Sequence, residues 1–393
     1  MNYRLLPLMA CIFSCCISIG IEERVFAGEA TSSLRESQWT CDTSSDFVYW
    51  NGPDDSSGYQ WYSTENVGFS AAYSNNVLLE LAIKTGYVLS HNDSASNSGS
   101  VGALTDTTTH FMIAYEKCEG VQPFITFDMN LPTGKATLIG SEKNAIMDRD
   151  LVPQTRFGEG RNVNPGIGVT IPISPKITSS LAVGYNTRNS YTPDGDFGYL
   201  YDPGDQIIIT TGLNYMSSKW IAALNATYTN EGESKLAGVP YFKPGNSYTA
   251  IGMVGCTWAL RQTTQVSLAF NYTGKNHVTD FFAGGYAEEE KDSNSTLYIA
   301  SVSHTYGVND RLSYKGTLSY LLRDKNKYEP ESDYFVSAKD KISVELDAQY
   351  KFSQTIDSAI GLGLFTLKQD ATPYLDSQHF LGVIGHAKLK VLF

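Results

Sequence analysis

The chain has 393 residues, of which 42% are hydrophobic and only 18% are charged. Its mean hydropathy of -0.21 excludes a bundle of membrane helices, and its net charge of -12 argues against a nucleic-acid partner. The 12% of aromatic residues include 25 Tyr, a composition that suits contact with lipid and headgroups when charges are few.

The first 27 residues have the pattern of a secretory signal peptide. Arg4 supplies a positive start, residues 5–21 are apolar, and Val25-Phe26-Ala27 suits cleavage. Past this segment, no apolar run reaches the roughly 20 residues that a membrane helix requires. Any membrane crossing is therefore expected to use strands.

Residues 28–76 are rich in aromatic side chains but lack a clear period. Trp39, Trp50 and Trp61 stand among Ser, Asp, Asn and Gly. The segment is too aromatic for a free linker. We expect it to pack separately from the regular strands that follow it.

Residues 77–393 alternate apolar and polar side chains in segments long enough to cross a bilayer with tilted strands. In 340–352, for example, Leu346 belongs to an apolar face and Asp347 to a polar one. A row of acidic and basic side chains on one strand face requires that face to be wet. The candidate strands are 78–90, 101–115, 121–131, 164–174, 177–188, 205–216, 219–230, 247–259, 263–274, 294–307, 311–323, 340–352, 355–368 and 380–393.

Tight turns and long polar loops alternate between these strands. Ser217-Ser218 and Ser353-Gln354 are tight turns, whereas 132–163 and 275–293 are long loops. This alternation is typical of a transmembrane barrel with periplasmic turns. The sequence therefore predicts an all-β, antiparallel up-and-down barrel of about 14 strands (range 12–16) over 77–393, in the bacterial outer membrane. Residues 28–76 are then a plug in the lumen or, less favoured, a periplasmic extension.

The last strand, 380–393, has a wholly apolar face and ends on an aromatic residue. It resembles the terminal strand of bacterial outer-membrane barrels, which the barrel-insertion machinery recognises. The resemblance implies that Leu389, Val391 and Phe393 form an insertion signal.

Charged side chains on the polar strand faces are expected to line the lumen. Both signs occur among them, which favours salt bridges that hold a plug or narrow the bore over a strongly ion-selective pore. The predicted lumen-lining residues are Glu80, Lys84, Asp106, His110, Asp128, Arg188, Lys315, Arg323, Glu345, Asp347, Lys351, His386, Lys388 and Lys390.

One stretch points beyond a generic barrel. Residues 127–135 read Phe-Asp-Met-Asn-Leu-Pro-Thr-Gly-Lys, followed by Phe-Gly-Glu-Gly at 157–160, Asn-Pro-Gly-Ile-Gly at 164–168 and Tyr-Asp-Pro-Gly-Asp at 201–205. This pattern resembles the meta-pathway phenol-degradation family of outer-membrane proteins, which is related to the long-chain fatty-acid transporters. The Asn-Pro-Ala motif of the fatty-acid branch is absent from 28–76. The resemblance implies passive uptake of small hydrophobic or aromatic compounds.

Two other functions remain as alternatives. One is a structural or adhesive barrel that acts through its extracellular loops, and the other is an outer-membrane lipase. His110 and Asp106 are too far apart along one strand to touch, and no Ser stands in a nucleophile elbow, so we expect no enzyme. No cofactor or metal site is expected. The expected partners are outer-membrane lipid, the insertion machinery and a small hydrophobic solute.

Three Cys remain after the signal peptide, and their spacing fits no metal site. Cys118 lies in a predicted periplasmic turn, and Cys41 belongs to a segment that starts on the same side. In an oxidising compartment these two either form a disulfide or stay free thiols beside Cys256.

Overall fold

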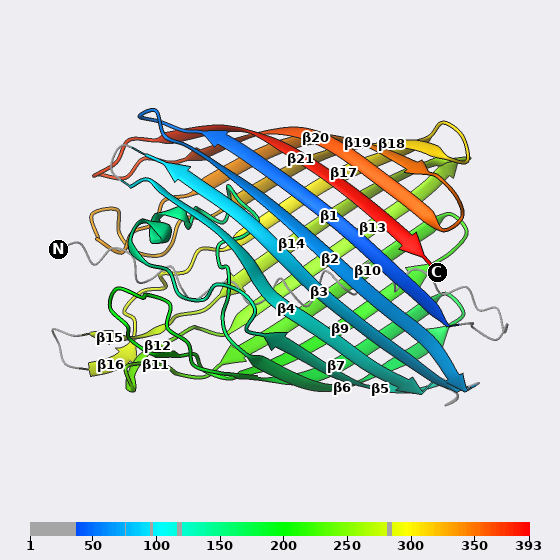
Figure 1. Ribbon diagram of the computed structural model, residues 1–393, viewed down its shortest axis with the longest axis horizontal. Coiled ribbons are helices and arrows are strands. Elements are labelled where there is room, and N and C mark those ends of the chain that lie inside the picture. The colour runs from blue at the N-terminus through cyan, green and yellow to red at the C-terminus, as the bar shows by residue number, and fades with distance from the viewer. Residues whose placement is uncertain (1–36, 75, 95–96, 116–119, 281–284) are drawn as a thin grey trace.

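The computed structural model describes residues 37–74, 76–94, 97–115, 120–280 and 285–393. Sixteen antiparallel strands close into a barrel (Figure 1). In ring order they are β1 (Gln38–Asn51), β2 (Ser57–Ser74), β3 (Val77–Asp93), β4 (Gly99–Tyr115), β5 (Gln122–Leu131), β6 (Asn162–Ser174), β7 (Ile177–Arg188), β9 (Gln206–Met216), β10 (Trp220–Glu231), β13 (Ser247–Ala259), β14 (Gln262–Thr273), β17 (Leu297–Gly307), β18 (Leu312–Arg323), β19 (Lys339–Lys351), β20 (Ile356–Gln369) and β21 (Gln378–Leu392). The predicted signal peptide lies outside the described residues.

All fourteen predicted strands are present, with ends that differ by at most three residues from those expected. The predicted count of about 14 was nevertheless too low, because β1 and β2 also belong to the wall. Residues 38–51 and 57–74 are therefore wall strands, and the plug expected from 28–76 is not what this part of the chain forms. The run Asp42-Thr43-Ser44-Ser45-Asp46 is polar on both strand faces, which hides the period-two pattern.

β1 closes the barrel by pairing with β21 from Thr40 to Asn51. The final residue continues this seam, since the Phe393 N–H donates to the Trp39 carbonyl at 2.9 Å and the Trp39 N–H donates to the Phe393 carbonyl at 3.3 Å. The C-terminal aromatic residue thus sits at the closing edge, with 75% of its surface exposed. Its role as an insertion signal, together with Leu389 and Val391, stays a prediction.

The outer face of the barrel is a belt of exposed apolar side chains. On β20, Ile360, Leu362 and Leu364 are each 64–68% exposed. Exposed aromatic side chains gather near the two ends of the strands, as expected for two interfacial girdles. Near the long-loop ends they include Tyr87, Tyr185, Tyr272 and Tyr320, and near the turn ends Tyr115, Trp258, Tyr306 and Tyr350. A closed barrel with this outer surface is a transmembrane barrel of the bacterial outer membrane.

The connections at the long-loop end form structure of their own. A five-stranded sheet contains β8 (Tyr201–Asp202), β11 (Ser234–Leu236), β12 (Val239–Lys243), β15 (His277–Asp280) and β16 (Gly285–Glu288), and Figure 1 shows much of it beyond the barrel wall. The loop between β5 and β6 contains the short 3-10 helix η2 (Gly140–Ala145). Among the described residues, no helix is long and apolar enough to cross a membrane.

Candidate functional site

The loop of residues 132–161 between β5 and β6, here called the inner loop, packs on the lumen face of the barrel. Its apolar side chains Met147, Leu151 and Val152 form a buried cluster with Val48 and Trp50 of β1, and with Phe365 and Leu367 of β20. These wall residues alternate with the exposed, lipid-facing residues of the same strands, so they point inward. The inner loop therefore occupies part of the lumen.

A second buried cluster holds the start and return of the inner loop against neighbouring strands. Leu138, Ala145 and Phe157 pack against Val88 of β3 and against Val101 and Ala103 of β4. Phe157 and Val88 are 2% and 0% exposed. The inner loop is thus a packed element rather than a surface connection, because its apolar side chains replace water along the wall.

Asp106 of β4 anchors both legs of the inner loop. One carboxylate oxygen accepts from the Gly134 N–H at 2.8 Å, and the other accepts from the Glu159 N–H at 2.7 Å and from Asn130 Nδ2 at 2.8 Å. Gly134 is required here, because a Cβ atom would come within 2.2 Å of the Phe157 carbonyl oxygen. Asp106 was predicted to line the lumen, and its structural task is to clamp these two legs together.

The tip of the inner loop is fastened to β18 by a buried ion pair. Arg323 donates from Nε to Asp150 Oδ2 at 2.8 Å and from Nη2 to Asp150 Oδ1 at 2.6 Å. The two side chains are 7% and 3% exposed. We call this bidentate pair the latch. Arginine suits it because its planar guanidinium matches a carboxylate with two parallel hydrogen bonds.

Two lysines of β19 reinforce the latch. Lys341 Nζ donates to the Asp150 carbonyl at 2.7 Å, and Lys339 pairs with Asp148. Burial opposes ionisation of Asp150, but its hydrogen bonds and the charge of Arg323 outweigh this and hold its pKa below the usual range. The Asp150 carboxylate at the tip is therefore ionised at neutral pH, and it lies next to the cationic side chains of Arg323 and Lys339.

The remaining predicted lumen residues fall into three groups. His110 and His386 contact Asp128 and Asp347, each at 2.5 Å. Arg188 pairs with Glu231 at 3.0 Å. Lys351 is exposed at the turn end of β19, on the same strand face as Asp347, and its place on the lumen wall stays a prediction. Half-buried residues on the inner faces of their strands are Glu80, Lys84, Lys315, Glu345, Lys388 and Lys390.

A row of polar side chains crosses the inner wall from β5 to β10. Asn164 Nδ2 donates to Asp128 Oδ2 at 3.2 Å, Asn186 Nδ2 donates to Gln206 Oε1 at 3.0 Å, and Gln206 Nε2 donates to Glu231 Oε2 at 2.7 Å. We call these five residues the amide ladder. Within the described part of the chain, the Oδ1 atoms of Asn164 and Asn186 are buried and accept no hydrogen bond.

Next to the amide ladder, from β13 onward, the inner wall carries an apolar strip. Ile251, Ile299 and Leu321 come from β13, β17 and β18, and strand register links them through Ala269. All three larger side chains are half-buried and lie on the strand face opposite the exposed residues Val254, Tyr298 and Tyr320. The lumen is therefore amphipathic, with polar and apolar walls.

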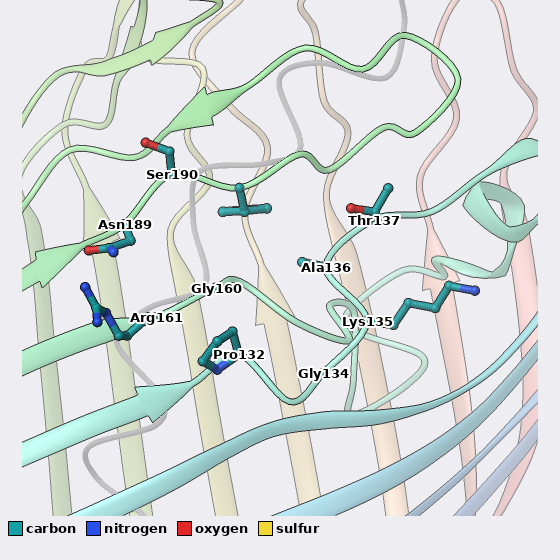
Figure 2. Close-up of a pocket in the computed structure, with 10 residues that line it drawn as sticks. Pro132, Gly134, Lys135, Ala136, Thr137, Gly160, Arg161, Asn189 and Ser190 are labelled. Carbon is teal, nitrogen blue, oxygen red and sulfur yellow. The ribbon is translucent and has the colours of Figure 1, made fainter.

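A cavity of about 600 Å³ opens at the long-loop end, between the two legs of the inner loop and the start of the loop after β7. We call it the mouth hollow. Figure 2 shows Pro132 and Arg161 on one side of it, with Asn189 and Ser190 on another. Arg161 directly precedes the first residue of β6, and Asn189 directly follows β7, so the hollow lies at the strand ends that carry the amide ladder.

No local pattern in the sequence predicts the packing of the inner loop or the latch. Asp150 lies in a loop with no period, and its partner Arg323 is 173 residues away. The motif residues at 132–134 and 157–158 form the two legs of the inner loop, which pass close to each other at Gly134 and Gly158. A further signal was available in the apolar inner residues of β1 and β20, which a water-filled lumen alone does not explain.

No disulfide bond is formed among the described residues. Cys41 lies in β1 and Cys256 in β13, and neither has a disulfide partner among the described residues. Cys118 lies outside the described residues, so its predicted pairing with Cys41 remains a prediction. Among the described residues, no group of three or more His, Cys, Asp or Glu side chains is placed to hold a metal ion.

No family model matches the chain, and no curated protein matches it. Solved structures that it resembles include the toluene transporter TodX of Pseudomonas putida, at 9% identity and a TM-score of 0.44 over 92% of this chain and 91% of that one. OpdQ of Pseudomonas aeruginosa matches at 10% identity with a TM-score of 0.45, over 91% of this chain and 100% of that one. An outer membrane channel of P. putida F1 matches at 12% identity with a TM-score of 0.44, over 69% of this chain and 96% of that one. The resemblance to the meta-pathway family stays a prediction.

Proposed function

We propose that this protein is a passive outer-membrane channel whose bore is narrowed by the inner loop, and that it admits small hydrophobic or aromatic compounds that carry a polar group. The observation that carries the proposal is the inner loop packed and latched inside a sixteen-stranded barrel. Barrels of this size leave an aqueous channel when nothing fills them. A folded segment fixed across the inner wall then sets the size and chemistry of the remaining passage.

The amphipathic lumen supports this solute class. The half-buried Asp128 and Asn164 of the amide ladder offer hydrogen-bond partners on one part of the wall, and the strip of Ile251, Ile299 and Leu321 offers apolar contact on another. A solute with an apolar body and one polar edge can satisfy both walls. A purely polar solute gains nothing from the apolar strip, and a purely apolar one leaves the amide groups without partners.

The experiment is solute flux through the purified full-length protein in liposomes and planar bilayers. We expect ion conductance together with faster uptake of benzyl alcohol and phenol than of sugars of similar size. Rapid swelling with sugars and no preference for aromatic solutes would identify a general porin instead. Absence of both conductance and uptake would refute the channel.

Adhesion is the second candidate function, because the long loops form an ordered five-stranded sheet beyond the wall. An ordered sheet presents a fixed surface to a partner, whereas loose loops do not. Deletion of residues 234–243 separates the two functions. A channel keeps its conductance after this deletion, and an adhesin loses attachment of the cells that display it.

A further inference from the structure

The mouth hollow has an unusual charge for this protein. The chain carries a net charge of -12, yet the residues that line the hollow include Lys135 and Arg161 and no Asp or Glu. Lys135 is already paired, at 2.5 Å, with Glu142. Arg161 is exposed, and among the described residues no carboxylate forms an ion pair with it. The hollow therefore presents one guanidinium that is available to an anion.

Polar groups beside Arg161 extend this anion-binding edge. Figure 2 shows the Arg161 guanidinium reaching toward Asn189, and Ser190 follows on the same segment. The Asn189 N–H donates to the Arg161 carbonyl at 3.0 Å, which fixes the two backbones side by side. A planar guanidinium with an adjacent amide is suited to the two oxygens of a carboxylate.

An apolar surface completes the hollow. Pro132 lines one side, and the Tyr191 ring, which packs edge-on against Tyr201 with centroids 5.6 Å apart, lines another. The Tyr191 phenol is neutral at neutral pH and does not repel an anion, and burial raises its pKa further above the usual value. Aromatic rings pair well with such a surface in offset or edge-on geometry.

The hollow is held in shape by the contacts that fix the inner loop. Asp106 binds the N–H groups of Gly134 and Glu159 and so sets the spacing of the two legs. The Tyr191 N–H and carbonyl pair with the Tyr201 backbone at 2.9 and 2.8 Å. A site whose walls are fixed before the solute arrives loses less entropy on binding.

We propose that the mouth hollow binds small aromatic carboxylates, with the carboxylate on Arg161 and the ring against Tyr191 and Pro132. The hollow would concentrate them at the strand ends that lead to the amide ladder. This deepens the proposed channel function and rests on it, because it names the solute class that the channel would collect at its mouth.

The test is calorimetric titration of the detergent-solubilised full-length protein with benzoate, so that binding is measured without any need for conduction. We expect saturable binding that weakens roughly tenfold or more in Arg161→Gln, since a charge-assisted bidentate contact is lost. Arg161→Lys should lose only part of the affinity. Arg311→Gln removes another exposed arginine, in the turn before β18, and is the matched control that should bind benzoate normally.

Two further probes separate the ring from the charge. Acetate lacks the ring and benzyl alcohol lacks the charge, so both should bind at least several-fold more weakly than benzoate. Tyr191→Phe should keep the affinity, and Tyr191→Ser should lower it. Heat-modifiable migration on gels verifies that each variant is folded.

Benzoate that does not bind the wild type, or that binds Arg161→Gln and wild type equally, overturns the proposal. Acetate that binds as tightly as benzoate overturns it as well, because the ring would then contribute nothing. Conductance in planar bilayers is recorded separately. A conducting protein that fails to bind benzoate refutes this site and leaves the channel standing, whereas a benzoate-binding protein with no flux supports the site and refutes the channel.

Discussion

Strands β20 and β9 both present apolar side chains to the membrane, but the residues on their inner faces differ. Their outward residues, such as Leu364 and Ile209, are exposed and apolar in both. Inside, β20 carries Phe365 and Leu367, which are 4% and 1% exposed under the inner loop. β9 instead carries Gln206 of the amide ladder and Ile208, which are 1% and 6% exposed. The inner residues of β20 are therefore buried against apolar side chains of the inner loop, whereas Gln206 is buried by hydrogen bonds to its neighbours on the wall.

The largest effect should come from breaking the latch. Arg323→Ala leaves Asp150 buried without its charge partner, which costs about 3–5 kcal/mol. We expect the tip of the inner loop to leave the wall, and single-channel conductance to rise. Asp150→Ala combined with Arg323→Ala should be less harmful to thermal stability than Arg323→Ala alone. Conductance equal to the wild type in all of these variants would show that the loop does not narrow the bore.

The next largest effect is expected from a pair of substitutions that compares the two faces of one wall strand. Leu346→Arg places a charge in the lipid-facing belt and should cost roughly 2–4 kcal/mol near the midplane. Its matched neighbour, Glu345→Arg, lies on the inner face and should be tolerated. The readout is the fraction of heat-modifiable, folded protein in the outer membrane. Equal losses for the two variants would contradict the register of β19.

The wall was largely predictable, and the inner loop was not. The fourteen predicted strands rest on a period of two, which is local and survives in any single strand. β1 and β2 were not predicted as wall strands, because polar residues occupy both of their faces. The course of the inner loop depends on Asp150 meeting Arg323, a contact between distant segments that no local pattern encodes. The roles of Asp106 and of the amide ladder likewise emerge only when neighbouring strands are aligned.

A smaller effect should follow from loosening the legs of the inner loop. Asp106→Ala removes the acceptor for Gly134 and Glu159 N–H groups, and hydrogen bonds to a charged group contribute about 1.5–3 kcal/mol. We expect noisier single-channel currents, because the inner loop remains latched at its tip while its legs move. Asp310→Ala, at an exposed turn position, is the control and should leave the currents steady.

The smallest effect concerns pH. The pKa of Asp150 lies below its usual value of 3.8, so the stabilisation from the latch is complete above that value and is lost as the pH falls through the lowered pKa. Wild-type conductance should therefore show no latch-dependent change from neutral pH down to about pH 5, and should rise only in stronger acid. Asp150→Asn should lack this acid-dependent rise. A rise in the wild type near pH 6 would contradict Asp150 as the group that responds.

The central claim, that the inner loop lies inside the barrel against β18, is tested most directly by cross-linking. Cysteines replace Asp148 of the loop tip and Lys339, which stands opposite Arg323 in the strand register, so that the latch stays intact. The native cysteines are replaced by Ser, and the protein is treated in the membrane with a short bismaleimide. We predict an efficient intramolecular cross-link for this pair. The control pair 148 and 225, which joins the loop tip to the inner face of β10, should remain unlinked. An unlinked first pair, or equal linking of both, would contradict a latched inner loop.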